Sequence, residues 1–304
     1  MALATTAPLP VGRLRRRWLI YAGAFAFVAP ALLNFLVFRY VPIVSAMYAS
    51  LFEYSLIGGF GEFIGLAHYR RALEDPTFFT AMRVTVLFVL LKVPLQVGLA
   101  LGLALLLQRQ LPATTIVRTA VFLPVVTALV IASTLWQMMY HPQQGLINGL
   151  LSTLGVPRQP FLTNAFQALP ALTAMTIWKD VGFSMVIFLA GLAGIPEVYY
   201  EAAAIDGANA WRRFVNITLP LLKRTTLFVT VTTTVFAFQV FTPIYVMTKG
   251  GPLDATKAVV YYVYQNAFAF NDMGYASALS IIVLFIILAV SLAQMWALRG
   301  EHEY

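Results

Sequence analysis

The sequence predicts an all-α integral membrane protein with six transmembrane helices. Hydrophobic residues make up 60 % of the 304 residues and charged residues only 11 %, whereas about 25 % of the residues are charged in soluble domains. So few charged side chains cannot cover a water-soluble surface, and so many apolar ones exclude a disordered chain. The second observation is the presence of six apolar segments, each long enough to cross a bilayer.

Each of these segments offers about 20 mainly apolar residues, the length that a spanning α-helix needs. Four of them contain no charged residue, the second contains Lys92, and the fourth contains Lys179 and Asp180. We therefore expect one transmembrane domain over residues 18–298, preceded by a basic segment 1–17 and followed by a short segment 299–304. The expected spans are Trp18–Phe38, Val84–Leu107, Thr119–Tyr140, Leu169–Leu192, Thr225–Thr248 and Ser277–Leu298.

The distribution of Lys and Arg predicts the orientation of these spans. If the N-terminus is cytoplasmic, the inner segments hold 11 Lys and Arg in 66 residues and the outer segments hold seven in 101. Cytoplasmic loops carry the excess of these residues, so both termini are expected in the cytoplasm. The same bias explains the net charge of +8 without a nucleic-acid partner. Ala24-Phe25-Ala26 resembles a signal-peptide cleavage site, but only four apolar residues, Trp18–Tyr21, precede it, so we expect an uncleaved anchor.

The residues that most enzymes and ion-coupled carriers need are missing. There is no cysteine, and the histidines at 68, 141 and 302 lie far apart, so no metal site is expected. No glycine precedes a lysine, which excludes a P-loop for ATP. Asp180 is the only acidic residue within an expected span. We therefore expect a protein that is not itself an enzyme.

The inner segment 194–220 predicts a helical hairpin. Pro196 suits a first helical position, and Gly207 suits the left-handed residue that follows a helix end. A helix is therefore expected over 196–206, and a second one over about 209–218 that ends before Pro220. The run Ala202–Ala204 gives the first helix a slim profile with one exposed acid, Glu201. Such a helix either joins two spans or fits a groove on another protein.

The residues of this hairpin resemble a known motif. Glu201-Ala202-Ala203, then Asp206-Gly207-Ala208 and Ile217-Thr218-Leu219-Pro220, is similar to the EAA motif of the permeases of binding-protein-dependent ABC importers. The resemblance implies the ABC type I importer permease (MetI-like) fold. It also implies that the first hairpin helix is a coupling helix, that Glu201 pairs with a cytoplasmic ATPase, and that Asp206 and Gly207 shape and cap the loop.

Further segments resemble the carbohydrate branch of this family, of the maltose and glycerol-3-phosphate type. The sequence does not show the extra N-terminal spans and large outer domain of the maltose member, so the six-span glycerol-3-phosphate type is more similar. The matching segments are Phe63–Leu66 with Tyr69, Trp178-Lys179 with Gly182-Phe183, Phe188–Leu192 with Ile195-Pro196, Gly250–Pro252 with Thr256, Tyr264 and Phe268, and Gly274–Ala278.

The resemblance also implies partners. These are a second permease subunit that completes a heterodimer, a cytoplasmic ATPase dimer that binds ATP and Mg, and an extracytoplasmic solute-binding protein. The chain itself would need no cofactor and would lie in the lipid of a bacterial or archaeal cytoplasmic membrane. The solute would be a sugar or a glycerol-phosphate-type compound.

Five residues in or near the spans are candidates for the solute pathway: Lys92, Trp178, Lys179, Asp180 and Gln239. A lysine inside a span usually faces the protein interior or water, and a cationic one would favour an anionic solute. Neighbouring side chains on a helix point about 100° apart, so Lys179 and Asp180 are expected to find separate partners. Structural roles between packed helices remain the alternative for all five.

Two other functions remain open from the residues alone. An ion-coupled carrier that acts without an ATPase would need a titratable centre in the spans, where only Asp180 is available. A membrane scaffold without transport activity would leave the charged residues inside two spans unexplained. Uptake that depends on a partner ATPase separates these alternatives from an importer.

Overall fold

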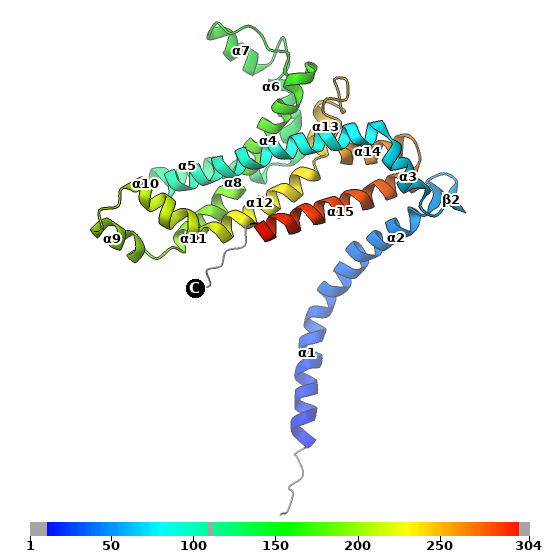
Figure 1. Ribbon diagram of the computed structural model, residues 1–304, viewed down its shortest axis with the longest axis horizontal. Coiled ribbons are helices and arrows are strands. Elements are labelled where there is room, and N and C mark those ends of the chain that lie inside the picture. The colour runs from blue at the N-terminus through cyan, green and yellow to red at the C-terminus, as the bar shows by residue number, and fades with distance from the viewer. Residues whose placement is uncertain (1–10, 109–111, 298–304) are drawn as a thin grey trace, which may run out of the picture.

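The structure is a computed structural model that describes residues 11–108 and 112–297. Long helices packed side by side form the body of the molecule, and an N-terminal helical arm extends away from it (Figure 1). Five helices are long and apolar enough to cross a membrane, or six if one bent pair counts as a single span. The expected all-α fold with six spans is thereby confirmed. Of the expected terminal segments, residues 1–10 and 299–304 lie outside the described residues.

The arm is longer than the first expected span. It consists of α1 (Val11–Phe35), the π-helical turn η1 (Leu36–Tyr40) and α2 (Val41–Ala49). In the most apolar 18-residue window of Gly23–Ala49, 0 % of the residues are buried. Only α2 reaches the body, where it packs against the last helix, α15. The arm therefore presents apolar side chains that its own chain does not cover.

The body is built from α4 (Pro76–Leu107), α8 (Ala165–Ala193), α12 (Lys223–Phe238) and α15 (Met273–Ala297). The pair α4 and α8 makes the most extensive contact between any two elements of the described chain. Small residues at 0 % exposure, such as Ala100 and Ala104 on α4, allow these helices to approach closely. Large side chains such as Phe88 and Phe188 fill the remaining space and are almost completely buried.

The third expected span is broken rather than straight. Residues 119–140 fall into α5 (Pro112–Val126) and α6 (Leu129–Met139), which meet at an angle of 102°. The fifth span is also interrupted, because α12 ends at Phe238 and α13 (Thr242–Met247) begins only after a short break. Both breaks free backbone groups at the depth of the spans, which membrane proteins tolerate only beside protein or a water-filled cavity.

Short elements complete the outer end of the body. A two-stranded antiparallel hairpin follows the arm, and short helices precede the second, fourth and sixth spans. Figure 1 places the β-hairpin and the short helices before the second and sixth spans opposite the inner helical hairpin, whereas the short helix before the fourth span projects to one side. The elements are β1 (Phe52–Ser55), β2 (Gly59–Phe63), α3 (Ala67–Glu74), α7 (Leu146–Thr153), the 3-10 turn η2 (Phe161–Thr163), α14 (Val259–Tyr264) and the π-helical turn η4 (Gln265–Ala269).

Asp75 ties several of these outer elements together. Its carboxylate caps α4 by accepting the Thr77 N–H at 2.8 Å. It also accepts the hydroxyls of Tyr262 on α14 at 2.6 Å and Tyr275 on α15 at 2.7 Å. Burial opposes ionisation of Asp75, but these hydrogen bonds and one from the Phe78 N–H outweigh it, so the pKa of Asp75 lies below its usual value. We call Asp75, Tyr262 and Tyr275 the outer clamp.

The inner helical hairpin differs in its boundaries from the prediction. Its first helix, α9, covers Val198–Ile205 rather than 196–206, and Pro196 lies outside it, since the residue that caps α9 is Glu197. The second arm does not end before Pro220. It runs without interruption through α10 (Ala210–Arg213), the π-helical turn η3 (Phe214–Thr218) and α11 (Leu219–Leu221).

The π-helical turns explain how two helices continue through a proline. Pro220 lies two residues after η3, and Pro42 lies two residues after η1. A proline in a regular α-helix has no N–H to donate, and its ring clashes with the carbonyl four residues earlier. In both helices that carbonyl falls inside the wider π turn, where the N–H of Leu219 donates to the carbonyl of Phe214, five residues before it. The wider turn therefore removes the clash.

Candidate functional site

A cavity of about 440 Å³ lies in the middle of the body. Its walls come from α4, α8 and α12 and from the two helix breaks, at Val125 and Leu129 and at Gln239–Pro243. Four of the five predicted pathway residues line it: Lys92, Lys179, Asp180 and Gln239. The helix breaks thus open onto a cavity that has mostly apolar walls and a few polar side chains.

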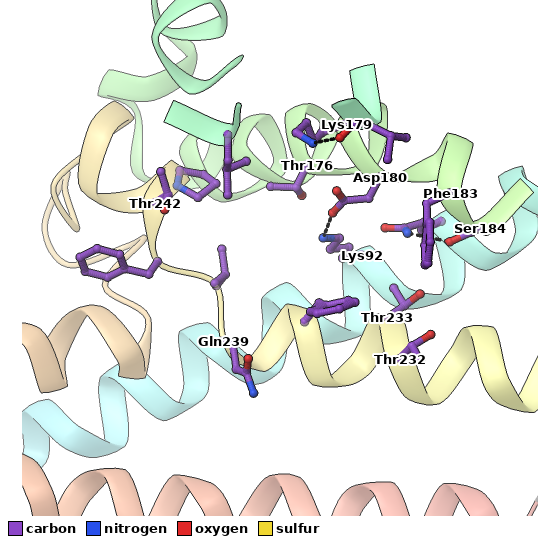
Figure 2. Close-up of a pocket in the computed structure, with 17 residues that line it drawn as sticks. Lys92, Thr176, Lys179, Asp180, Phe183, Ser184, Thr232, Thr233, Gln239 and Thr242 are labelled. Carbon is purple, nitrogen blue, oxygen red and sulfur yellow. Dashed lines mark hydrogen bonds and ion pairs between the residues drawn. The ribbon is translucent and has the colours of Figure 1, made fainter. Parts of the chain in front are cut away.

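Lys92 and Asp180 face each other across this cavity (Figure 2). The Lys92 Nζ lies 2.7 Å from Asp180 Oδ2, and the side chains are 5 % and 39 % exposed. A lone lysine inside a membrane is costly, and an adjacent carboxylate neutralises it. Lys92 is therefore not the unbalanced cation that was expected to favour an anionic solute. The pair also joins α4 to α8 in a fixed register.

Lys179 has a different partner, as the 100° divergence predicted. Its Nζ donates to the carbonyl oxygen of Val125 at 2.9 Å, and the residue is 8 % exposed. Val125 lies in the last turn of α5, where carbonyl groups have no helical partner and a cation interacts favourably with the helix dipole. Lys179 therefore caps the broken third span from α8.

Gly182 explains how α5 comes close enough for this cap. A Cβ added at Gly182 would lie 2.4 Å from the carbonyl oxygen of Val121 and 2.9 Å from the Cα of Phe122. Only a residue without a side chain allows the backbones of α5 and α8 to approach this closely. The Trp178-Lys179 and Gly182 segment thus has a structural role at the break.

Trp178, the fifth predicted pathway residue, does not line the cavity. Its ring packs against Trp136 of α6, with ring centroids 5.4 Å apart, and it lies along an apolar groove between α4 and α8. Gln239 lies on the cavity wall but away from the Lys92–Asp180 pair, at the end of α12 (Figure 2).

Sequence analysis missed a second polar pair on the same two helices. The Gln96 Nε2 donates to Ser184 Oγ at 3.0 Å, one helical turn from the ion pair on each helix. Both pairs are separated by 88 residues in the sequence, which fits two parallel helices in register. The Oε1 of Gln96 is buried and has no hydrogen-bond partner within the described part of the chain. The sequence did contain a signal for this pair, because each of the two spans carries two polar residues four positions apart, Lys92 and Gln96 in one and Asp180 and Ser184 in the other.

The inner helical hairpin is the second candidate site. None of the residues of α9 is buried, and Glu201 is exposed. Among the described residues, no ion pair or hydrogen bond involves the Glu201 carboxylate. A hydrogen bond of 2.9 Å between the hydroxyls of Tyr200 and Thr218 joins α9 to η3. The helix is thus held against the second arm of the hairpin, while its acid faces outward.

The end of α9 carries the cap that the sequence predicts. Gly207 has φ +74°, the left-handed conformation that suits glycine. Its N–H donates to the carbonyl of Ala204 at 3.1 Å, and the N–H of Ala208 donates to the carbonyl of Ala203 at 2.8 Å. These two bonds form a Schellman motif with Asp206 as the C-cap. The predicted role of Gly207 as the residue after the helix end is confirmed.

Comparison with known proteins identifies the family. Residues 76–299 match the family described as "Binding-protein-dependent transport system inner membrane component". The sn-glycerol-3-phosphate transport system permease protein UgpA of Agrobacterium fabrum is 35 % identical over 92 % of this chain and 96 % of its own length. The arabinooligosaccharides transport system permease protein AraP of Bacillus subtilis is 34 % identical over 96 % of this chain and 95 % of its own length.

A solved structure also matches almost the whole chain. It is a crystal structure of a bacterial alginate ABC transporter in complex with an alginate pentasaccharide-bound periplasmic protein. The superposition has a TM-score of 0.80 at 25 % identity and covers 93 % of this chain and 94 % of that one. The chain therefore belongs to the family of inner-membrane components of binding-protein-dependent transport systems, the permease subunits of ABC importers.

Proposed function

We propose that this chain is the permease subunit of an ATP-driven importer for a sugar or glycerol-phosphate-type solute. An extracytoplasmic binding protein delivers the solute, a second permease completes the pathway, and a cytoplasmic ATPase dimer drives alternating access. The single observation that carries the proposal is the exposed, capped helix α9 with the free carboxylate of Glu201. The names of the relatives support the solute class, because they refer to arabinooligosaccharides and sn-glycerol 3-phosphate.

In this proposal α9 is the coupling helix. Its slim face, formed by Ala202 and Ala203, enters a groove on the ATPase, and Glu201 pairs with a cation there. Asp206, Gly207 and Ala208 hold the turn that returns the chain to the membrane. Closure of the ATPase dimer pulls the inner helical hairpin, and η3 and α11 carry the movement into α12, which forms one wall of the cavity.

The cavity serves as part of the solute pathway. Its polar groups offer hydrogen bonds to the hydroxyls of a solute, and the buried Oε1 of Gln96 is an acceptor still without a partner in the described chain. Such a mixture of apolar walls and a few placed polar groups is typical of small-molecule sites. Gln239 supplies a further amide at the end of α12.

The arm supports the need for a second permease. The most apolar window of the arm, within Gly23–Ala49, has no buried residues in the described chain, whereas that of α4 is 44 % buried. A partner subunit in the membrane supplies the missing neighbour. In this arrangement both termini and the inner helical hairpin face the cytoplasm, and the β1–β2 hairpin faces outward.

An ion-coupled carrier is the alternative. Within the described chain, Asp180 is the only acidic residue on the cavity wall, and Lys92 binds its carboxylate. A proton or cation would have to compete with this ammonium group. The cavity therefore favours transport that draws its energy from another subunit.

Co-purification tests the proposal. The tagged chain is expressed in its own host and purified in mild detergent, alongside Glu201→Lys and the matched control Glu62→Lys. Glu62 is an exposed acid on β2, at the opposite end of the molecule. We expect the wild type and the control to bring down an ATPase and a second permease, and Glu201→Lys to lose the ATPase. A folded wild-type chain that purifies alone would contradict the proposal and favour the carrier.

A further inference from the structure

A cluster of aromatic side chains continues outward from the cavity wall. Phe241 lines the cavity, and its ring centroid lies 5.4 Å from that of Tyr245 and 5.1 Å from that of Tyr264. The ring of Phe268 follows at 5.1 Å from Tyr264. Tyr261 lies behind, 6.3 Å from both Phe241 and Tyr264. We call these five residues, from the second helix break, α13, α14 and η4, the outer aromatic cluster.

The cluster has a buried base and an exposed face. Tyr261 is 6 % exposed, and its ring packs against Gly250, where an added Cβ would lie 3.0 Å from the ring. In contrast, Tyr245 is 43 % and Phe268 is 60 % exposed. An aromatic cluster that only filled the core would bury all of its rings. In this cluster Tyr261 is buried, whereas Tyr245 and Phe268 remain exposed beside the cavity that Phe241 lines.

The chemistry of these faces suits a sugar ring. An aromatic face carries partial negative charge, and a sugar ring presents one face of slightly positive C–H groups with hydroxyls around its edge. The phenol groups of Tyr245 and Tyr264 donate and accept hydrogen bonds, as those edge hydroxyls require. The cluster contains no charged side chain, so it offers an acyclic phosphate ester no partner for its charge. It therefore fits the ring of a sugar better than glycerol 3-phosphate.

Aromatic residues also gather at membrane interfaces, where they contact lipid headgroups. An interfacial belt need not be continuous with a cavity inside the body of the protein. Here Phe241 belongs to both the cavity wall and the cluster, and consecutive ring centroids lie 5.1–5.4 Å apart from Phe241 to Phe268. This continuity favours a molecule that moves between the cluster and the cavity over a lipid.

We propose that the outer aromatic cluster is a stacking subsite for sugar rings, at which a sugar rests before it enters the cavity. The proposal rests on the assignment of the cavity to the solute pathway. It adds a location outside the cavity and a preference for cyclic sugars over acyclic phosphate esters. Tyr245 and Phe268 supply the stacking faces, and Phe241 transfers the ring to the cavity.

Saturation-transfer NMR on the full-length chain in detergent tests this subsite without any partner subunit. The probes are lactose and arabinotriose, with glycerol 3-phosphate as the acyclic comparison. The variants are Tyr245→Leu and Phe268→Leu, which keep an apolar side chain but remove the aromatic face. The controls are Tyr245→Phe, which keeps the ring, and Phe285→Leu, which removes a ring that is 54 % exposed on α15, outside the cluster.

We expect saturation transfer to the ring C–H protons of the sugars and little to glycerol 3-phosphate. Each Leu variant within the cluster should weaken apparent sugar affinity roughly three- to tenfold, in line with the loss of a stacking contact, while both controls stay near wild type. Absent transfer to both sugars, or equal transfer in the wild type and both Leu variants, would overturn the subsite. Because no ATPase takes part, failure here is distinct from failure of the co-purification experiment. If Tyr245→Leu does not fold, the result for Phe268→Leu alone decides whether the cluster is a sugar subsite.

Discussion

The charged residues of the cavity differ from Glu201 of the inner helical hairpin in whether the charge has a partner within the described chain. In the cavity, Lys92 binds Asp180 and Lys179 binds a helix-end carbonyl, so each charge has a close partner. On α9, Glu201 is exposed and unpaired within the described chain. Water can solvate the hairpin charge but is scarce in the spans, so only the cavity charges must be satisfied internally. Paired charges hold this fold together, and the unpaired one is available to another protein.

The largest effect is expected from Asp180→Ala, because it leaves the nearly buried ammonium of Lys92 without its partner. We expect a loss of about 3 kcal/mol in stability, at the low end for broken buried pairs because Asp180 is 39 % exposed. Thermal unfolding in detergent measures it. The double variant Lys92→Met with Asp180→Leu should recover most of the loss, since apolar residues can replace a buried pair.

An ion pair that is more exposed than Lys92–Asp180 provides the control for this prediction; the side chain of its lysine, Lys257, is 16 % exposed, against 5 % for Lys92. Asp254 lies 2.8 Å from Lys257 in the outer loop, and its side chain is 48 % exposed. Asp254→Ala should cost less than about 1 kcal/mol. Equal losses from Asp180→Ala and Asp254→Ala would mean that the cavity hydrates Lys92 as bulk water does, and the contrast between the two regions would disappear.

The outer clamp extends the comparison to a carboxylate at the edge of the spans. The pKa of Asp75 is lowered, so its ionised form stabilises the folded state above the pKa of the unfolded chain, about 3.9. This stabilisation is lost as the pH falls through the lower pKa of the folded state. Asp75→Asn should reduce stability at pH 7 by about 2 kcal/mol, the value of hydrogen bonds to a charged group.

Unfolding temperatures of the wild type and Asp75→Asn, measured between pH 7 and pH 3, check this. The difference should shrink toward the acid end of the range. Glu74→Gln, which removes the charge of the exposed neighbouring residue, should change little at any pH. A difference between wild type and Asp75→Asn that grows on acidification would show that the sign of the pKa shift is wrong.

The smallest effect is expected at the hairpin cap. Gly207→Ala forces an L-residue into the left-handed region at φ +74°, which costs about 1 kcal/mol. Since no residue of α9 is buried, the global unfolding temperature should not change. Hydrogen exchange in the last turn of α9 should instead accelerate about fivefold, which corresponds to the same 1 kcal/mol. Gly155→Ala, at the same φ in an outer loop, should leave exchange in α9 unaffected.

Local signals predicted local structure well. The glycine after α9 and the divergence of Lys179 from Asp180 both follow from helix geometry, which a short stretch of sequence contains. The partner of Lys92 could not be predicted in this way, because it depends on the register in which α4 packs against α8. That partner, Asp180, lies 88 residues further along the chain. The break between α5 and α6 was also missed. Pro124 lies inside α5, but a proline does not by itself announce the 102° turn three residues later, which the close approach at Gly182 and the cap from Lys179 stabilise.

Two prolines show a limit of the rule that a proline ends an α-helix. The second hairpin arm was expected to end before Pro220 but runs past it, and the N-terminal arm likewise runs past Pro42. Each does so through a π turn that ends two residues before the proline. The rule that a proline ends a helix assumes a regular α-helical carbonyl four residues earlier. A local widening of the helix removes that assumption, and nothing in the residue types of the two turns announces it.

The bare arm has a consequence for how the subunit is made. A membrane helix satisfies its backbone hydrogen bonds within its own segment, so α1 can enter the bilayer as soon as it leaves the ribosome. In the proposed assembly its final packing then waits for the second permease, because the most apolar window of the arm, within Gly23–Ala49, has no buried residues in the described chain. The amount of correctly assembled subunit would thus follow the supply of its partner by mass action. Excess copies would keep an uncovered helix that membrane quality control can recognise.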